Sequence, residues 1–134
     1  MKKFFLIFIT VIIVLLIGVV LMTFLFSSKV NITSNNAVLY NEYKDIQINQ
    51  ELTSYEALLI KSIFNGKRLY KENLYCGFGK NVSIEFNGLY FEIANDDCAT
   101  IKFANEDKYF NITSKQKKEI EAIFIKYGGN IHVF

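Results

Sequence analysis

The chain has 134 residues, enough for one small domain, and its 15 basic and 13 acidic residues give a formal net charge of +2. Two of the basic residues, Lys2 and Lys3, precede a long apolar run, so the remaining 13 basic residues balance the 13 acidic ones. Without a basic excess, this part of the chain lacks the charge that nucleic acids attract, and we expect no nucleic-acid partner.

An unbroken apolar run over residues 4–26 predicts a membrane-spanning helix. At about 1.5 Å per residue the run is roughly 34 Å long, against a hydrocarbon core of about 30 Å. The alternative is a cleaved secretory signal, but such signals have an apolar core of only about 7 to 15 residues and a small-residue cleavage site. The sequence favours an uncleaved signal-anchor over residues 1–28, with the lipid bilayer as the partner of residues 4–26.

The charges beside the apolar run predict its orientation. Lys2, Lys3 and the free amino group precede the run, whereas only Lys29 follows it closely. The positive-inside rule therefore places the N-terminus in the cytoplasm. We expect a single-pass protein of the cell membrane whose C-terminal part lies outside.

Residues 29–50 show no clear periodicity and are predicted to form a partly structured stalk. The segment 27–36 is polar and has neither helical nor strand spacing. The segment 37–50 is ambiguous, because its first half fits one or two helical turns, whereas Ile46 and Ile48 alternate as in a short strand.

The first clear element is an amphipathic helix over residues 54–65. Thr53 can cap its N-terminus, and Glu56, three residues later, completes a capping box. Gly66 supplies a residue that readily adopts the left-handed conformation that ends helices.

A β-hairpin over residues 82–94 is the strongest local signal in the chain. Asn87 and Gly88 form the dipeptide preferred in two-residue type I′ turns, and alternating runs flank it. This turn pairs Ile84 with Phe91, which gives the sheet one apolar face. We expect the opposite face to be exposed and to bind a partner through a surface that comprises Ser83, Glu85, Tyr90, Glu92, Thr100 and Lys102.

Two further strands and a second helix complete the predicted domain, which spans residues 51–134. The strands cover 98–103 and 109–112, and Thr113 with Gln116 forms a second capping box before an apolar helical stripe. The expected fold is a two-layer α+β domain in the order helix, four-stranded antiparallel meander, helix, with both helices on the apolar sheet face.

The two cysteines of the chain lie at the same end of this predicted meander. Cys76 precedes its first strand and Cys98 begins its third, so a disulfide between them is within reach. Such bonds persist outside the cytoplasm, where the orientation of the anchor would place both residues. The alternatives are two reduced thiols, or a site for thiol catalysis or metal binding.

Five short motifs are spread across the predicted domain: Cys76-Gly77-Phe78, Val82-Ser83-Ile84, Ile93-Ala94, Asp96-Asp97-Cys98 and Lys126-Tyr127-Gly128. The pattern resembles that of small secreted or membrane-tethered bacterial domains with a Cys-Gly-Phe and Asp-Asp-Cys core and no assigned function. The resemblance covers about residues 52–129. It implies that the two cysteines act as a unit, and it implies no chemistry.

Three lysines in the first turn of the second helix break a local rule. Lys115, Lys117 and Lys118 lie where the helix dipole favours acidic side chains. One interpretation is an anion site formed with the free amide groups of this turn. The other is a solvated face, because Glu119 and Glu121 follow two of these lysines by four residues and offset their charge.

The sequence contains little that indicates catalysis. His132 is the single histidine, and a Cys-His nucleophile would require it to dock beside a cysteine. The acidic turns at 95–97 and 105–107 fit turn chemistry better than a calcium loop. We expect a membrane-anchored, non-catalytic binding or interaction domain without metal or cofactor. The alternative is a thiol- or metal-dependent envelope enzyme that uses Cys76 or Cys98.

Overall fold

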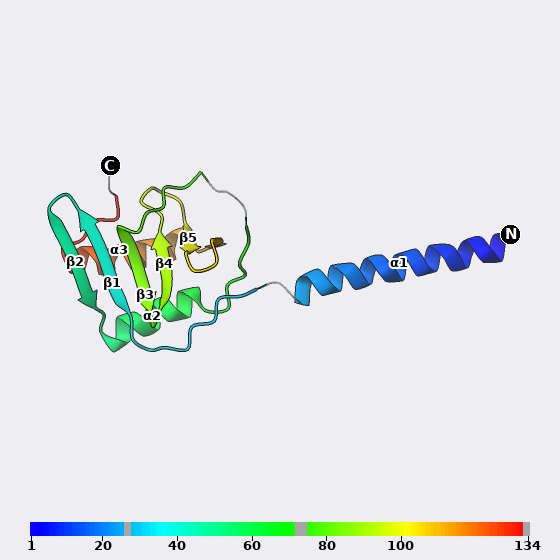
Figure 1. Cartoon of the computed structure of the whole chain (residues 1–134), viewed down its shortest axis with the longest axis horizontal. Helices are drawn as coiled ribbons and strands as arrows, with labels where there is room; N and C mark the ends of the chain where they lie inside the picture. The colour runs from blue at the N-terminus through cyan, green and yellow to red at the C-terminus, as the bar shows by residue number, and fades with distance from the viewer. Residues whose placement is uncertain (26–27, 72–74, 133–134) are drawn as a thin grey trace.

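The computed structural model describes residues 1–25, 28–71 and 75–132. A long N-terminal helix extends away from a sheet domain that contains the other elements (Figure 1). In chain order these are α1 (Lys2–Leu25), β1 (Val38–Tyr43), β2 (Ile46–Glu51), α2 (Ser54–Phe64), β3 (Val82–Phe86), β4 (Leu89–Ile93), β5 (Thr100–Phe103), β6 (Lys108–Asn111) and α3 (Ser114–Lys126).

The helix α1 is long and apolar enough to cross a membrane, as predicted. It has 24 residues, and none of its apolar window is buried against the domain. Its polar hydroxyls are satisfied within the helix, because Thr10 donates to the carbonyl of Leu6 at 2.6 Å and Thr23 to that of Val20 at 2.8 Å. The predicted end of the span at residue 26 lies outside the described residues.

The domain contains one six-stranded antiparallel sheet, with the strand order β2-β1-β3-β4-β5-β6. The strands β3 to β6 form the expected meander, and the α+β class is confirmed. The predicted number of four strands is wrong, because β1 pairs with both β2 and β3. The order of elements is accordingly a hairpin, a helix, four strands and a helix.

The hairpin β1–β2 occupies most of the second half of residues 29–50, which were expected to be a partly structured stalk, and it extends one residue beyond them. Its two-residue turn consists of Lys44 and Asp45, and Lys44 adopts a φ of 54° without the glycine or asparagine that usually marks such a turn. On β2, Ile46 and Ile48 alternate with amides, but the next position on the inward side, opposite the core residue Leu39, carries the polar Gln50. The alternation that predicts a strand is therefore weak here.

The hairpin β3–β4 has the predicted turn and register. Asn87 and Gly88 both have positive φ values, of 47° and 83°, as a type I′ turn requires. Ile84 pairs with Phe91, and both side chains are fully buried.

One apolar core joins the sheet to both helices. Phe64 of α2 packs its ring against Phe91 and Phe110 of the sheet, at centroid distances of 5.0 and 5.2 Å. From α3, Ile120 and Phe124 are fully buried in the same core. The two helices therefore share the apolar face of the sheet.

Residues before β1 also belong to the domain. Val30 and Ile32 are buried in the core. The amide of Val30 donates to the carbonyl of Lys67 at 2.9 Å, and that of Ile32 to Oδ1 of Asn65 at 2.8 Å. The domain thus begins well before residue 51, where the sequence placed its start.

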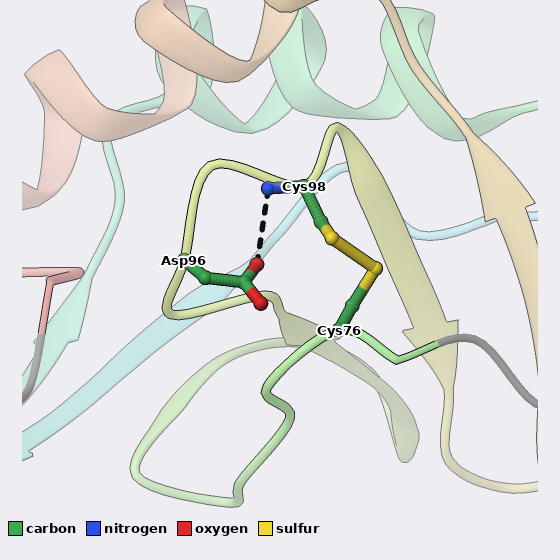
Figure 2. Close-up of side chains that lie close together, drawn as sticks. All are labelled: Cys76, Asp96 and Cys98. Carbon is green, nitrogen blue, oxygen red and sulfur yellow. Dashed lines mark hydrogen bonds between the residues drawn. A yellow bond between two sulfur atoms is a disulfide. The ribbon is translucent and has the colours of Figure 1, made fainter.

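A disulfide ties the long connection between α2 and β3 to the turn before β5 (Figure 2). Cys76 and Cys98 form this bond, with their Cα atoms 5.8 Å apart. Beside it, the amide of Asn95 donates to the carbonyl of Gly77 at 2.8 Å. A Cβ atom at residue 77 would lie 2.0 Å from Oδ1 of Asn95, so any other residue at this position would have to displace the Asn95 side chain.

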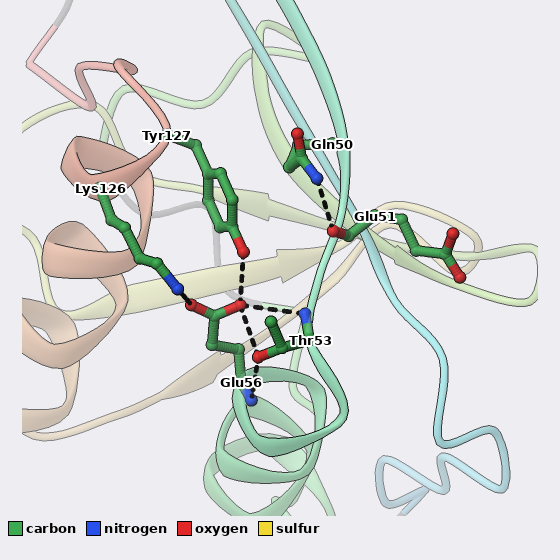
Figure 3. Close-up of polar contacts among 6 residues, drawn as sticks. All are labelled: Gln50, Glu51, Thr53, Glu56, Lys126 and Tyr127. Atoms are coloured by element: carbon green, nitrogen blue, oxygen red, sulfur yellow. Dashed lines mark hydrogen bonds and ion pairs between the residues drawn. The ribbon is translucent and has the colours of Figure 1, made fainter.

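Both predicted capping boxes are present, and the first extends into a link between the helices. Thr53 caps α2, and its hydroxyl and amide donate to Oε2 of Glu56 at 2.8 and 3.0 Å. From α3 and its C-terminus, Lys126 Nζ donates to Oε1 of Glu56 at 2.5 Å, and the Tyr127 hydroxyl donates to Oε2 at 2.7 Å (Figure 3). One buried carboxylate therefore holds α2 and α3 together.

These four hydrogen bonds determine the acidity of Glu56. Burial by itself would raise the pKa of this carboxyl, but the bonds from Lys126, Tyr127 and Thr53 stabilise its ionised form and lower the pKa to about 2. The same contacts raise the pKa of Lys126 and of Tyr127, chiefly through their hydrogen bonds to Glu56.

We predict that Glu56 makes the stability of the domain depend on pH below its ordinary pKa of 4.5. Because the pKa is lower in the folded state, the ionised carboxylate stabilises the fold above pH 4.5, and this stabilisation is lost as the pH falls from 4.5 towards 2. With allowance for the solvent around Lys126, the loss should be about 2 kcal/mol.

Urea unfolding of the full chain in detergent, followed by the near-ultraviolet circular dichroism of its tyrosines, measures this effect. Glu56→Gln should lower the unfolding midpoint at neutral pH and flatten its change with pH in this window, whereas the exposed control Glu51→Gln should leave both unchanged. An equally steep change with pH in Glu56→Gln would contradict the assignment.

Candidate functional site

The face of the sheet opposite the core carries a row of polar side chains. Side chains alternate along each strand, so the neighbours of core residues such as Leu39, Ile84 and Phe91 point to this outer face. The strand pairing aligns one such residue from every strand in a row: Asn49, Tyr40, Ser83, Glu92, Lys102 and Tyr109.

The segment that carries Cys76 covers the β5–β6 half of this face. The ring of Phe78 lies 5.4 Å from that of Tyr109, and the disulfide holds Cys76 beside Cys98, just before β5. At the sheet edge, Tyr70 pairs with Tyr109 through two backbone hydrogen bonds of 3.0 and 2.9 Å.

This cover changes the predicted interaction surface. Ser83, Glu92 and Thr100 were expected to be exposed, but only 5 to 6% of each residue is accessible, so for them the prediction is wrong. Each of the three side chains is held by a neighbour. The Ser83 hydroxyl donates to the carbonyl of Lys80 at 3.2 Å, Glu92 lies 3.7 Å from Lys102 Nζ, and the Thr100 hydroxyl donates to Oδ1 of Asn111 at 3.1 Å. Tyr90 is 44% exposed.

A groove of about 680 Å³ remains open on the outer face, over the adjacent strands β2, β1, β3 and β4. Its lining includes side chains of β1 and β2, which were not part of the predicted surface, and Ser83, Tyr90 and Glu92, which were. The residues that carry its chemistry are Tyr40, Glu42, Gln47, Asn49, Lys80 and Tyr90. The first four of these residues lie on β1 and β2, so they would have been predicted if residues 38–51 had been assigned to a hairpin.

Two asparagines in the wall of the groove hold the chain around it in place. Asn41 donates from Nδ2 to the carbonyl of Asn130 at 3.0 Å and accepts the amide of Asn130 at 3.0 Å. Asn105 accepts the amide of Tyr90 at 2.7 Å and donates to the carbonyl of Gly88 at 2.8 Å. These bonds connect β1 and β4 to neighbouring loops and fix the shape of the groove.

The Tyr40 hydroxyl is held by Glu85, the predicted surface residue on β3. It donates to Oε2 of Glu85 at 2.9 Å, and this hydrogen bond raises the pKa of Tyr40. The other carboxylate oxygen of Glu85 accepts the amide of Gly88 at 3.1 Å. Tyr40 is therefore a fixed and neutral wall of the groove.

The charged residues of the row neutralise one another. Lys102 Nζ lies 3.7 Å from Oε2 of Glu92 and 3.4 Å from Oδ1 of Asp107. Burial would lower the pKa of Lys102, but these two carboxylates outweigh it and raise the pKa. Lys102 is thus engaged within the sheet.

Three side chains of the groove have hydrogen-bonding capacity to spare. The hydroxyl of Tyr90, the amide of Asn49 and the ammonium of Lys80 make no hydrogen bond with any residue that the structure describes. A ligand in the groove would thus find an exposed aromatic ring, a neutral donor and acceptor pair, and one cation.

The three lysines of α3 do not form the predicted anion site. Lys115 and Lys118 are exposed, but Lys117 is only 4% exposed. Its Nζ donates to the carbonyls of Ala94 at 2.7 Å, Asp96 at 2.5 Å and Cys98 at 2.8 Å. With its three protons used in this way, Lys117 fixes the turn before β5 and is not available to an anion.

A sequence signal for this burial existed. Ile120 and Phe124 follow Lys117 by three and seven residues, so the lysine belongs to the apolar stripe of α3. Burial lowers the pKa of Lys117, and the nearby acidic residues Glu121 and Asp96 only partly oppose this.

The disulfide lies next to a carboxylate with a backbone role. Asp96 accepts the amide of Cys98 on Oδ1 at 3.0 Å (Figure 2), and it accepts the amide of Gly77 on Oδ2 at 2.8 Å. Burial alone would raise its pKa, but these two bonds lower it. The sulfur atoms and a carboxylate oxygen lie within 4.8 Å of one another, as ligands of a metal do. In the disulfide, however, neither sulfur is the thiolate that metal binding or thiol catalysis requires.

We predict that Lys117 is needed for stability, and that its neighbour Lys118 is not. Lys117→Met keeps most of the apolar stem but leaves three carbonyls without their donor, and should cost about 2 to 4 kcal/mol of unfolding free energy. Lys118→Met changes an exposed side chain and should stay within about 0.5 kcal/mol of the unmodified chain. Urea titrations of the oxidised proteins compare them, and equal midpoints for the two variants would refute the role of Lys117.

Comparison with known proteins does not assign the chain to a family. No family model, curated protein sequence or solved structure matched it. Its function is therefore to be inferred from the groove, the disulfide and the apolar N-terminal helix.

Proposed function

We propose that the protein is a single-pass membrane protein that presents a non-catalytic binding domain, and that an extended segment of a partner protein binds in the groove of the outer sheet face. The observation that carries this proposal is the groove itself. Its volume of about 680 Å³ lies within the range of about 300 to 1,000 Å³ that is usual for ligand sites.

The chemistry of the groove supports a protein partner. Tyrosine is enriched at the centres of protein interfaces, and the exposed ring of Tyr90 stands in the groove with its hydroxyl unpaired among the described residues. Asn49 and Gln47 come from β2, so the groove extends to the edge strand of the sheet. An edge strand has a free row of backbone donors and acceptors, which favours an extended segment as the ligand.

Photocrosslinking from the groove tests the proposal. A benzoylphenylalanine side chain in place of Tyr90 should form one dominant crosslinked product in membranes of the cells that make the protein. The matched control is Tyr55, which is 76% exposed on α2, in the helical layer on the other side of the sheet. The same reagent at Tyr55 should not give that product.

The captured partner then permits an affinity measurement. Tyr90→Ala should weaken its binding by about 1 to 3 kcal/mol and leave the unfolding midpoint unchanged, because an anchoring aromatic ring is lost from the surface only. Tyr55→Ala should bind normally. Identical products from both crosslinking positions, or full affinity in Tyr90→Ala, would show that the partner does not bind in the groove.

For the orientation of the anchor we predict that protease added to intact cells digests residues 29–134 and leaves the N-terminal segment protected. The excess of positive charge before α1 supports this direction of insertion. Epitope tags at the two ends of the chain, detected before and after digestion, provide the measurement. Protection of the C-terminal tag until the cells are opened would reverse the proposed topology.

A further inference from the structure

The base of the domain, next to α1, carries four cations: Lys29, Lys67, Arg68 and Lys71. We propose that this base lies on the headgroups of the bilayer that holds α1 and binds anionic lipid there. The inference rests on the proposed membrane anchoring and is independent of which side of the membrane carries the domain.

The chain keeps the base close to the end of α1. The carbonyl of Ser28 accepts the amide of Leu69 at 2.9 Å, and the amide of Val30 donates to the carbonyl of Lys67 at 2.9 Å. Only residues 26 and 27 separate Leu25, the last residue of α1, from this ladder. Three Cα-to-Cα steps of 3.8 Å reach at most about 11 Å, so the base cannot move far from the end of the span.

A side-chain contact places one of the cations at the level of the last helical turn. The guanidinium carbon of Arg68 lies 5.3 Å from the ring centre of Phe24 in α1. When α1 spans a bilayer, Phe24 is near the boundary of the hydrocarbon core. Arg68 then lies in the headgroup region.

The four cations are not neutralised within the domain. Lys29 and Arg68 stand opposite each other in an antiparallel bridge, an arrangement in which like charges repel. Among the described residues, no carboxylate forms an ion pair with any of the four. Lys108, whose Nζ also reaches this base through Ser28, is paired with Glu106 at 2.7 Å and is therefore left out.

The charge of the remaining domain has the opposite sign. The four cations give the base a charge of +4. Residues 29–134 contain 13 basic and 13 acidic residues, so the other residues of this sequence range comprise 9 basic and 13 acidic ones, a net charge of −4. An anionic bilayer would attract the base and repel the rest of the domain. The charge distribution therefore favours the same orientation as the backbone ladder, with the base towards the membrane.

A fluorescence experiment on the full chain tests this inference. The chain has no tryptophan, so Asn31→Trp places a single reporter at an exposed position beside the base. This protein is reconstituted in nanodiscs of phosphatidylcholine, with or without phosphatidylglycerol, in which lipids brominated near the headgroup quench nearby tryptophan. Every protein in the comparison carries the same tryptophan. Any affinity of this side chain for the membrane interface is therefore common to all samples and does not affect the differences between them.

Quenching in the anionic nanodiscs should exceed that in the neutral ones by about twofold at low salt. The difference should disappear at about 1 M salt, where the Debye length is about 3 Å. It should also disappear in the base variant Lys67→Gln, Arg68→Gln, Lys71→Gln. The matched control Lys44→Gln, Lys115→Gln, Lys118→Gln removes three cations elsewhere and should behave like the parent.

Two different failures can be told apart. Flotation of the protein with the nanodiscs reports the insertion of α1, so protein that does not float with either lipid would overturn both the anchoring and the docked base. Protein that floats but is quenched equally in neutral and anionic nanodiscs would overturn the lipid contact alone. That comparison uses the parent chain and does not depend on how the variants fold.

Discussion

The burial of Phe91 is the constraint on which the rest of the domain depends. Its ring lies 5.0 to 6.2 Å from those of Phe64, Phe86, Phe103 and Phe110, so one side chain on β4 joins three neighbouring parts of the sheet to α2. Since successive side chains on a strand point to opposite faces, the inward direction of Phe91 turns Tyr90 and Glu92 outward. The core therefore sets both the position of the helices and the residues that the groove can use.

The parts of the fold that the sequence predicted depend on residues close together in the chain. The turn at Asn87 and Gly88, the capping boxes of Thr53 and Thr113, and the apolar run of α1 are each defined within a few positions. The strand β1 is different, because its place depends on pairing across more than forty residues, as between Val38 and Glu85. With an unusual turn and amide side chains on β2, this hairpin had no strong local pattern to reveal it.

The candidate site divides in the same way. The outward direction of Tyr90 followed from strand alternation, and the proximity of Cys76 and Cys98 followed from the meander. The burial of Thr100 and Glu92 accompanies their contacts with Asn111 and Lys102 on neighbouring strands, which is a tertiary property. Lys117 lies between these cases, because its place in the apolar stripe could be predicted but its three carbonyl partners could not.

The attachment of β1 has a mechanical consequence. Tyr40 in the wall of the groove belongs to β1. The chain that precedes β1 leads through Val30 to α1. A tensile load on a bound partner would therefore pass to the membrane along a continuous piece of backbone. The ladder between Ser28 and Leu69 contains few hydrogen bonds, whereas β1 is paired with a strand on each side. Under force the tether would lengthen first, while the groove kept its shape.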